Sequence, residues 1–218
     1  ETTVSEANNG SNSQPSNISE VTIRLAGNSQ DGIQSIGGFL ARLAGRSERD
    51  VMTMMTIPST ISGGASIFQV RLGSGEVLSP GDKADVLFAF YQHSYDNHVA
   101  NLAKGGVLVY DSDHVEPCEE WLTKYRHIGI AISSLTVEAI GGTARDKGKN
   151  IYALGLIAGM FSLDIMKLER LINERFGSKS ESILKTAMDA FQAGCRYQSN
   201  DISNLFRLAR GGAERSNQ

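Results

Sequence analysis

Hydrophobic and polar positions divide the chain into short apolar runs and longer amphipathic stretches. Runs at 51–57, 86–90 and 107–110 are apolar, as is typical of strands covered on both faces. Residues 65–72 instead alternate between apolar and polar side chains, which predicts a half-exposed strand. Residues 76–78 could return as its hairpin partner, giving an antiparallel addition to a parallel sheet.

Helical periodicity appears between these runs and dominates the last third of the chain. After a first strand at 21–26, apolar residues recur every three or four positions from Ile33 to Ala44. The same period predicts helices at 94–103 (closed by Gly105 and Gly106), 135–142, 151–160, 163–176 and 180–197, with one more strand at 128–132. Strands that alternate with helices indicate an α/β fold: a doubly wound, mostly parallel sheet with an antiparallel hairpin addition and a C-terminal helical section.

The two ends of the chain differ in composition from its middle. Residues 1–20 contain almost nothing apolar and are predicted to be a disordered leader. Residues 21–198 form one predicted Rossmann-type domain, since a chain of this length suits a single core. Residues 199–218 end in a polar, glycine-bearing tail that reads as a linker, so the chain is interpreted as a possible piece of a longer protein.

Charge and cysteine content exclude several classes of function. A net charge of −3 and a pI near 5.8 leave no basic stripe for nucleic acid. No run approaches the roughly 20 apolar residues that cross a bilayer, and no secretory signal is visible. Cys118 and Cys195 lack metal-like spacing; a disulfide between them stays open, but reduced thiols in a cytoplasmic protein are the favoured interpretation.

The turn between the first strand and the first helix is the leading candidate site. Unpaired N–H groups and the positive end of the dipole make such a helix start suitable for anions. The turn lacks the three glycines of a dinucleotide fingerprint and the lysine of a phosphate loop. A ligand-free turn capped by Ser29 or Asp31 is the structural alternative. The residues concerned are Gly27, Asn28, Gln30, Asp31 and Gly32.

A second glycine-bearing loop and a few polar side chains complete the inventory. Ser62, Gly63 and Gly64 form a loop that a ligand or another backbone could approach closely, although a plain hairpin entry is equally compatible. His93 and His98 follow the 86–90 strand without metal-like spacing. The basic residues Arg145, Lys147 and Lys149 are expected on a solvated face, with a phosphate contact as the alternative. No nucleophile elbow, metal site or catalytic set is predicted.

Four blocks in a fixed order resemble a known family: GNSQDG at a helix start, TIPSTISGGASIFQVRL, SPGDKADVLFAF and KGGVLVYD. From about Val21 to Tyr197 the chain resembles the gamma subunit, or gamma domain, of 2-oxoacid:ferredoxin oxidoreductases. The family's Gly-Gly-Gln-Gly turn is here Ser29-Gln30-Asp31-Gly32. The Glu and Arg of the family's second loop are missing, since this chain reads Ser59-Thr60-Ile61-Ser62 before Gly63.

The resemblance implies a subunit that is inactive alone. The variant is of the kind in which the gamma domain is fused ahead of an alpha (pyrimidine-binding) domain, often in enzymes specific for 2-oxoglutarate. The implied complex decarboxylates a 2-oxoacid on thiamine diphosphate with magnesium, passes electrons through iron–sulfur clusters to ferredoxin, and forms an acyl-coenzyme A. Those cofactors are implied for partner alpha and beta parts, while the gamma part shares the coenzyme A site, bordered by the two loops named above. A purely structural subunit and a stand-alone nucleotide-binding domain are the alternatives.

Overall fold

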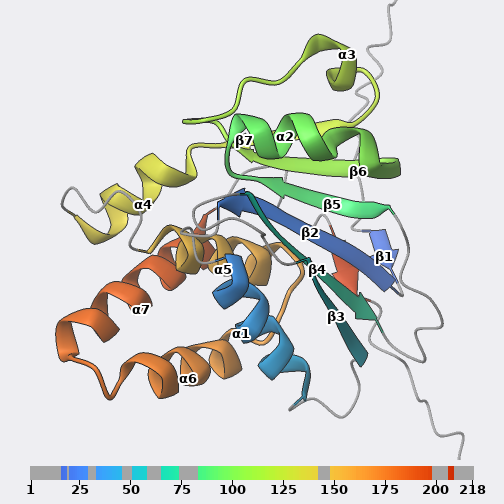
Figure 1. Ribbon diagram of the computed structural model, residues 1–218. Coiled ribbons are helices and arrows are strands. Elements are labelled where there is room, and N and C mark those ends of the chain that lie inside the picture. The colour runs from blue at the N-terminus through green and yellow to red at the C-terminus, as the bar shows by residue number, and fades with distance from the viewer. Residues whose placement is uncertain are drawn as a thin grey trace, which may run out of the picture.

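A six-stranded mixed sheet forms the centre of the protein (Figure 1). The computed structural model describes residues 16–18, 20–28, 33–45, 51–57, 65–73, 83–141, 148–197 and 206–208. In spatial order the strands are β3 (Val51–Ile57), β4 (Ala65–Gly73), β2 (Glu20–Asn28), β5 (Ala84–Ala89), β6 (Leu102–Asp111) and β7 (Arg126–Ile130). Strands β2, β5, β6 and β7 run parallel to one another.

Strand β4 is the antiparallel member of this sheet. It is hydrogen-bonded along its length to β2 on one side and to β3 on the other, both in antiparallel register. The predicted antiparallel strand at 65–72 is therefore confirmed, but its two neighbours are β2 and β3. The hairpin partner proposed at 76–78 lies outside the described residues. Alternation along a strand reports which side chains are buried and carries no information about which strands pair.

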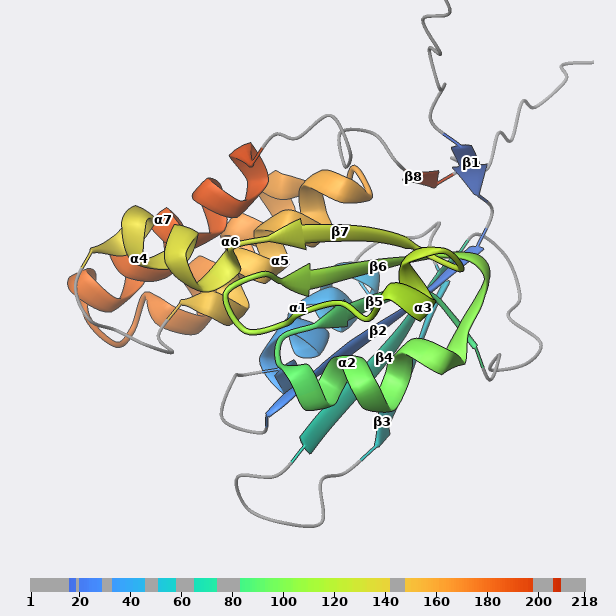
Figure 2. The ribbon, with the colours of Figure 1, turned by 90° about the horizontal axis from the view of Figure 1, so that it is seen from above.

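Helices cover both faces of the sheet, which confirms the doubly wound α/β class. On one face lie α1 (Ile33–Gly45), α5 (Lys149–Met160), α6 (Ile165–Phe176) and α7 (Glu181–Arg196) (Figure 1). On the other lies α2 (Gln92–His98), followed by the short 3-10 helix η2 (Val99–Asn101) (Figure 2). Two shorter helices, α3 (Glu119–Leu122) and α4 (Ile132–Ile140), flank β7. None of the helices in these described ranges is long and apolar enough to cross a membrane.

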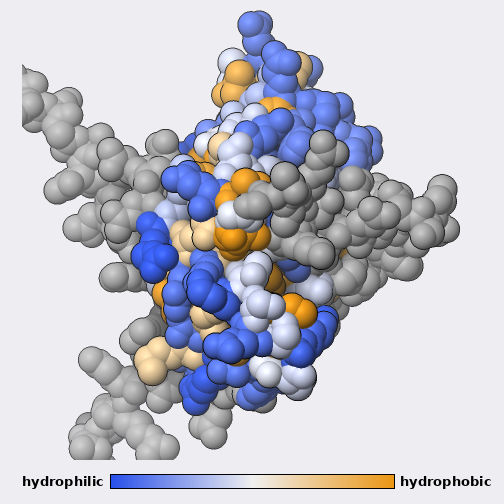
Figure 3. Space-filling model, turned by 90° about the vertical axis from the view of Figure 1, so that its left-hand side faces the viewer, coloured by the Kyte–Doolittle hydropathy of each residue, from blue (hydrophilic) through white to orange (hydrophobic). Residues whose placement is uncertain are grey.

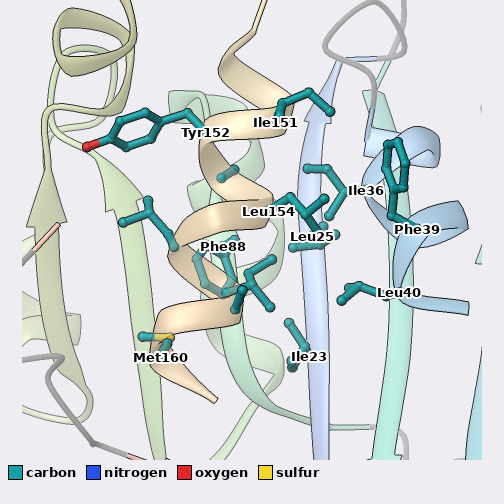
Figure 4. Close-up of a cluster of buried hydrophobic side chains, with 14 of the residues drawn as sticks. Ile23, Leu25, Ile36, Phe39, Leu40, Phe88, Ile151, Tyr152, Leu154 and Met160 are labelled. Carbon is teal, nitrogen blue, oxygen red and sulfur yellow. The ribbon is translucent and has the colours of Figure 1, made fainter. Parts of the chain in front are cut away.

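Alternation along the central strands builds a separate hydrophobic core on each face. Ile23, Leu25 and Phe88 point into the larger core, where α1 and α5 pack (Figure 4). The intervening residues Ala26 and Leu87 point to the opposite face and pack in a second core with Tyr95 and Val99. Because parallel strands between two helical layers bury both faces, both sets of side chains are apolar.

Helix α5 is buried on nearly every side, as its apolar sequence predicts, and it packs closely on α7. A Cβ added at Gly155 would lie 2.3 Å from the carbonyl oxygen of Phe191. A Cβ added at Gly194 would lie 2.2 Å from the carbonyl oxygen of Tyr152. Backbone therefore touches backbone where the two helices cross, and a side chain at either position would force them apart.

The structure corrects some element boundaries near the middle of the chain. Gly105 and Gly106 do not close the predicted 94–103 helix, because both lie within β6, where Gly105 has a φ of +77°. The helix itself begins at Gln92 and ends at His98. Pairing with β5 extends β6 back to Leu102 despite the low strand preference of glycine.

A small two-stranded parallel sheet lies near the chain ends. It joins β1 (Ser16–Ile18) to β8 (Phe206–Leu208). These residues belong to the predicted leader and tail, whose other residues, apart from Glu20 in β2, lie outside the described ranges. The domain limits at 20 and 198 stay a prediction.

Candidate functional site

The carboxyl ends of the parallel strands meet at one edge of the sheet, on the left of Figures 1 and 2. The chain leaves β2 through α1 on one face and leaves β5 through α2 on the opposite face, while β2 and β5 are neighbours. Open α/β sheets generally bind ligands where the chain changes direction in this way. The end of β5 is tied to β2 by a hydrogen bond from Phe90 N to Ala26 O of 3.1 Å. Figure 3 views this side, where hydrophilic surface is interrupted by small hydrophobic patches.

Two of the sequence-predicted site residues lie at this switch point. Gly27 is buried and faces Ser66 of β4, and Asn28 ends β2 opposite Ala65. Ala65 is the residue that follows Gly64, so both predicted loops join the sheet at directly paired positions. No local pattern in the sequence predicts this juxtaposition, although the family resemblance implied that both loops border one site. Gln30, Asp31, Gly32, Ser62, Gly63 and Gly64 themselves lie outside the described residues, and their contacts stay a prediction.

A buried ion pair stands at the same edge, beyond β6. Lys149 Nζ lies 2.8 Å from Asp111 Oδ2, and the two side chains are 3% and 0% exposed. The expectation of a solvated face is therefore wrong for Lys149, whereas Arg145 and Lys147 lie outside the described residues. Lys149 begins α5 after Gly148, which has a φ of +106°, so the turn directs its side chain inward.

Asp111 is ionised in this environment. Burial by itself would raise the pKa of its carboxyl, but the Lys149 ammonium and two hydrogen bonds outweigh burial and lower it. Those bonds come from Ser133 Oγ at 2.7 Å and from the backbone N–H of Asp113 at 3.1 Å. Asp111 thus links the end of β6 to the starts of α4 and α5.

Two aromatic rings lie beside the Lys149 ammonium. Its Nζ lies 4.6 Å from the ring centroid of Tyr91 and 5.3 Å from that of Phe90. Tyr91 is stacked with His93 at 5.8 Å and lies 5.2 Å from His114 in a tilted arrangement. Cation–π attraction to two rings adds to the ion pair in holding the ammonium in place. Asp111, Tyr91 and His114 were not predicted from the sequence, although Asp111 ends β6 and the other two closely follow the ends of β5 and β6.

The histidines of α2 do not suggest a metal centre. His98 is half-buried, and burial followed by the nearby Arg24 and His93 lowers its pKa, which favours the neutral ring. In the ranges that the structure describes, no group of three or more His, Cys, Asp or Glu side chains is arranged to hold a metal ion. Among the described residues, this edge instead presents backbone groups at the strand ends, the rings of Phe90 and Tyr91, and the buried ammonium of Lys149.

Comparison with known proteins places this edge in context. The pattern of the pyruvate ferredoxin/flavodoxin oxidoreductase family matches residues 22–197. The chain belongs to this family. Its similarity to gamma subunits is confirmed by a solved keto/oxoacid ferredoxin oxidoreductase gamma subunit from Geobacter sulfurreducens PCA, which matches with a TM-score of 0.64 and 25% identity over 80% of this chain and 94% of that one.

Two longer relatives refine the comparison for this family member. Subunit KorA of a Mycobacterium tuberculosis 2-oxoglutarate oxidoreductase is 30% identical over 83% of this chain and 31% of its own length. A Magnetococcus marinus 2-oxoglutarate:ferredoxin oxidoreductase, solved with 2-oxoglutarate, coenzyme A and succinyl-CoA bound, matches with a TM-score of 0.76 and 28% identity. That match covers 88% of this chain and 33% of the other. The chain thus spans about a third of these relatives.

Proposed function

We propose that this chain is the gamma part of a 2-oxoacid:ferredoxin oxidoreductase that acts on 2-oxoglutarate. The proposed complex oxidatively decarboxylates the 2-oxoacid, transfers the acyl group to coenzyme A and reduces ferredoxin. The observation that carries the proposal is the match over 88% of the chain to the Magnetococcus marinus enzyme, whose structure holds 2-oxoglutarate, coenzyme A and succinyl-CoA. The 30% identity to a KorA subunit supports the same substrate.

The chemistry of decarboxylation and electron transfer is assigned to partner parts. Two cysteines in the whole chain cannot ligate a four-cysteine cluster, so the iron–sulfur centre belongs elsewhere in the proposed complex. Thiamine diphosphate and magnesium are likewise placed with the alpha and beta parts. This chain then contributes assembly and one wall of the coenzyme A site, in a complex that works in the cytoplasm.

The proposed wall is the switch point between β2 and β5. Asn28, at the end of β2, pairs with Ala65 at the start of β4, so the residue before one candidate loop and the residue after the other are neighbours in the sheet. N–H groups at the start of α1 favour the negative charge of coenzyme A phosphates. Asp31 would oppose those phosphates unless its carboxylate caps the helix. The Asp111–Lys149 pair ties the end of β6, two strands away from β2, to the start of α5.

A bulky substitution at the turn tests the site in the assembled complex. Gly32→Trp should raise the Michaelis constant for coenzyme A by roughly tenfold, equivalent to about 1.4 kcal/mol of binding. The Michaelis constant for the 2-oxoacid should stay unchanged. Gly159→Ala, on α5 and in ordinary contact with Cys195, is the control for folding. An unchanged constant for coenzyme A in Gly32→Trp would show that the turn does not border the site.

A structural subunit that touches no ligand is the second candidate. The buried ion pair favours it to the extent that Asp111 and Lys149 stabilise the sheet edge without meeting a ligand. Calorimetry with coenzyme A, NAD and ATP, first on this chain and then on the assembled complex, separates the candidates. Binding of coenzyme A alone, weakened by Gly32→Trp, supports the proposal. Binding of NAD would instead indicate a nucleotide-dependent oxidoreductase domain.

A further inference from the structure

A hollow opens along α1, on the side of the helix that meets the end of α6. Its volume is about 220 Å³, and it is lined by Ser35, Gly38, Phe39, Arg42 and Arg175. Four of these residues come from α1 at spacings of three or four, which places them on one face of the helix. Arg175 comes from the last turn of α6. Gly38 has open space where its side chain would be, so the hollow comes close to the α1 backbone.

The hollow carries a surplus of positive charge. Two guanidinium groups, those of Arg42 and Arg175, line the hollow. Arg42 Nη2 lies 3.0 Å from Glu174 Oε2, so the Glu174 carboxylate balances the charge of Arg42. The Arg175 guanidinium lies 5.9 Å from the ring centroids of both Phe39 and Phe176, and no carboxylate of the described residues pairs with it. A guanidinium held against aromatic rings keeps its N–H edge available, and that edge matches phosphate oxygens.

The position of the hollow relates it to the switch point. Ser35 belongs to the first turn of α1, which begins at Ile33 just beyond the end of β2. From Ser35 to Arg42 the helix rises by about 10 Å. A long ligand with one end over the sheet edge can therefore extend along α1 into the hollow. Phe39 adds an apolar wall, which suits a ligand that combines phosphate with a flat ring.

We infer that this hollow binds the phosphorylated nucleotide end of coenzyme A, with Arg175 as the principal phosphate ligand. The inference rests on the proposed function and extends the proposed coenzyme A site from the turn at 27–32 to the hollow between α1 and α6. Arg42, already paired with Glu174, contributes positive charge, and Ser35 offers a hydroxyl donor. The thiol end then points away from the hollow, toward the sheet edge and the partner parts.

Equilibrium dialysis of the assembled complex measures the dissociation constants of coenzyme A and of pantetheine, which lacks the nucleotide. Arg175→Gln should weaken coenzyme A binding roughly tenfold or more, since a charged hydrogen bond is lost. Gly38→Leu, which keeps both arginines and fills open space, should have a similar effect. Pantetheine binding should be unchanged in both variants. Arg170→Gln removes an exposed arginine of α6 that does not line the hollow, and it is the matched control.

The dissociation constants of coenzyme A and pantetheine together decide the inference. Weakened binding of coenzyme A alone supports the inference, and dephospho-coenzyme A then shows whether the ribose phosphate or the diphosphate meets Arg175. Unchanged coenzyme A binding in Arg175→Gln and Gly38→Leu overturns it. Equal weakening of pantetheine and coenzyme A overturns it as well, because the variants then act on assembly. If Gly32→Trp weakens coenzyme A binding while the hollow variants do not, the proposed function stands without this subsite.

Discussion

Replacing Gly194 by alanine tests the close crossing of helices α5 and α7. The added Cβ would lie 2.2 Å from the carbonyl oxygen of Tyr152, about 1.2 Å closer than the 3.4 Å at which ordinary contacts begin. Its other near neighbours, Gly155 Cα and Leu156 N at 3.1 Å, are also backbone atoms. No side chain can rotate away, so the helices α5 and α7 must separate.

The expected cost follows from the two effects that oppose each other. Overpacking a core of this kind costs about 1–3 kcal/mol, and the high end applies because backbone must move. The better helix propensity of alanine returns up to about 1 kcal/mol. We expect a net loss of roughly 2 kcal/mol in the free energy of unfolding, or a fall of about 4–8 °C in Tm for a chain of this size.

Urea denaturation followed by circular dichroism measures this change through the transition midpoint at constant slope. Gly159→Ala is the matched control on α5, because its Cβ would lie 3.4 Å from the nearest atom, the Cys195 carbonyl oxygen. That variant should be as stable as the parent or more stable by up to about 1 kcal/mol. Gly155→Ala should resemble Gly194→Ala, and the double variant should cost less than the sum, because both methyl groups separate the same two helices. A Gly194→Ala protein as stable as Gly159→Ala would refute the close crossing.

Further predictions concern the buried ion pair and the thiols. Lys149→Met should cost about 3–5 kcal/mol in urea denaturation at pH 7, because it leaves the Asp111 carboxylate buried and unpaired, and adding Asp111→Asn should recover part of that loss. The pKa of Asp111 in the folded protein lies below its ordinary 3.8. The ionised carboxylate therefore stabilises the folded state above pH 3.8, and this stabilisation disappears as the pH falls through the folded pKa. Plots of unfolding free energy from about pH 6 to about pH 2 should accordingly be flatter in the double variant. Burial, aided by the nearby Glu169, raises the pKa of the Cys195 thiol to about 11. Alkylation at pH 8, followed by mass spectrometry, should therefore modify the exposed Cys118 first and Cys195 only after unfolding. Equal rates of alkylation at the two thiols of the folded protein would contradict the burial of Cys195.

Local patterns along the chain were enough to predict the layers of the fold. The apolar runs ending at Phe90 and Tyr110 predicted strands covered on both faces, and β5 and β6 confirm this prediction. The apolar pattern at 151–160 predicted a buried helix, and α5 is that helix. The amphipathic pattern at 163–176 likewise predicted a helix, and α6 is present there; the structure adds that the side chain of Asp164 caps its start by accepting a hydrogen bond from Lys167 N at 3.0 Å. These features depend on neighbours within a few residues, so local pattern is enough to find them.

Contacts between residues far apart in the sequence depend on how the whole chain packs. Nothing near Lys149 in the sequence indicates that its ammonium is buried against Asp111, because the partner is brought there by the packing of α5 over β6. The pairing of Asn28 with Ala65, which joins the two candidate loops, depends on β4 entering the sheet between β2 and β3. The hollow between α1 and α6 likewise exists because α6 returns along α1 and brings Arg175 to Phe39. Strand order and helix packing are set by the balance of burial over the whole chain, which no local pattern contains.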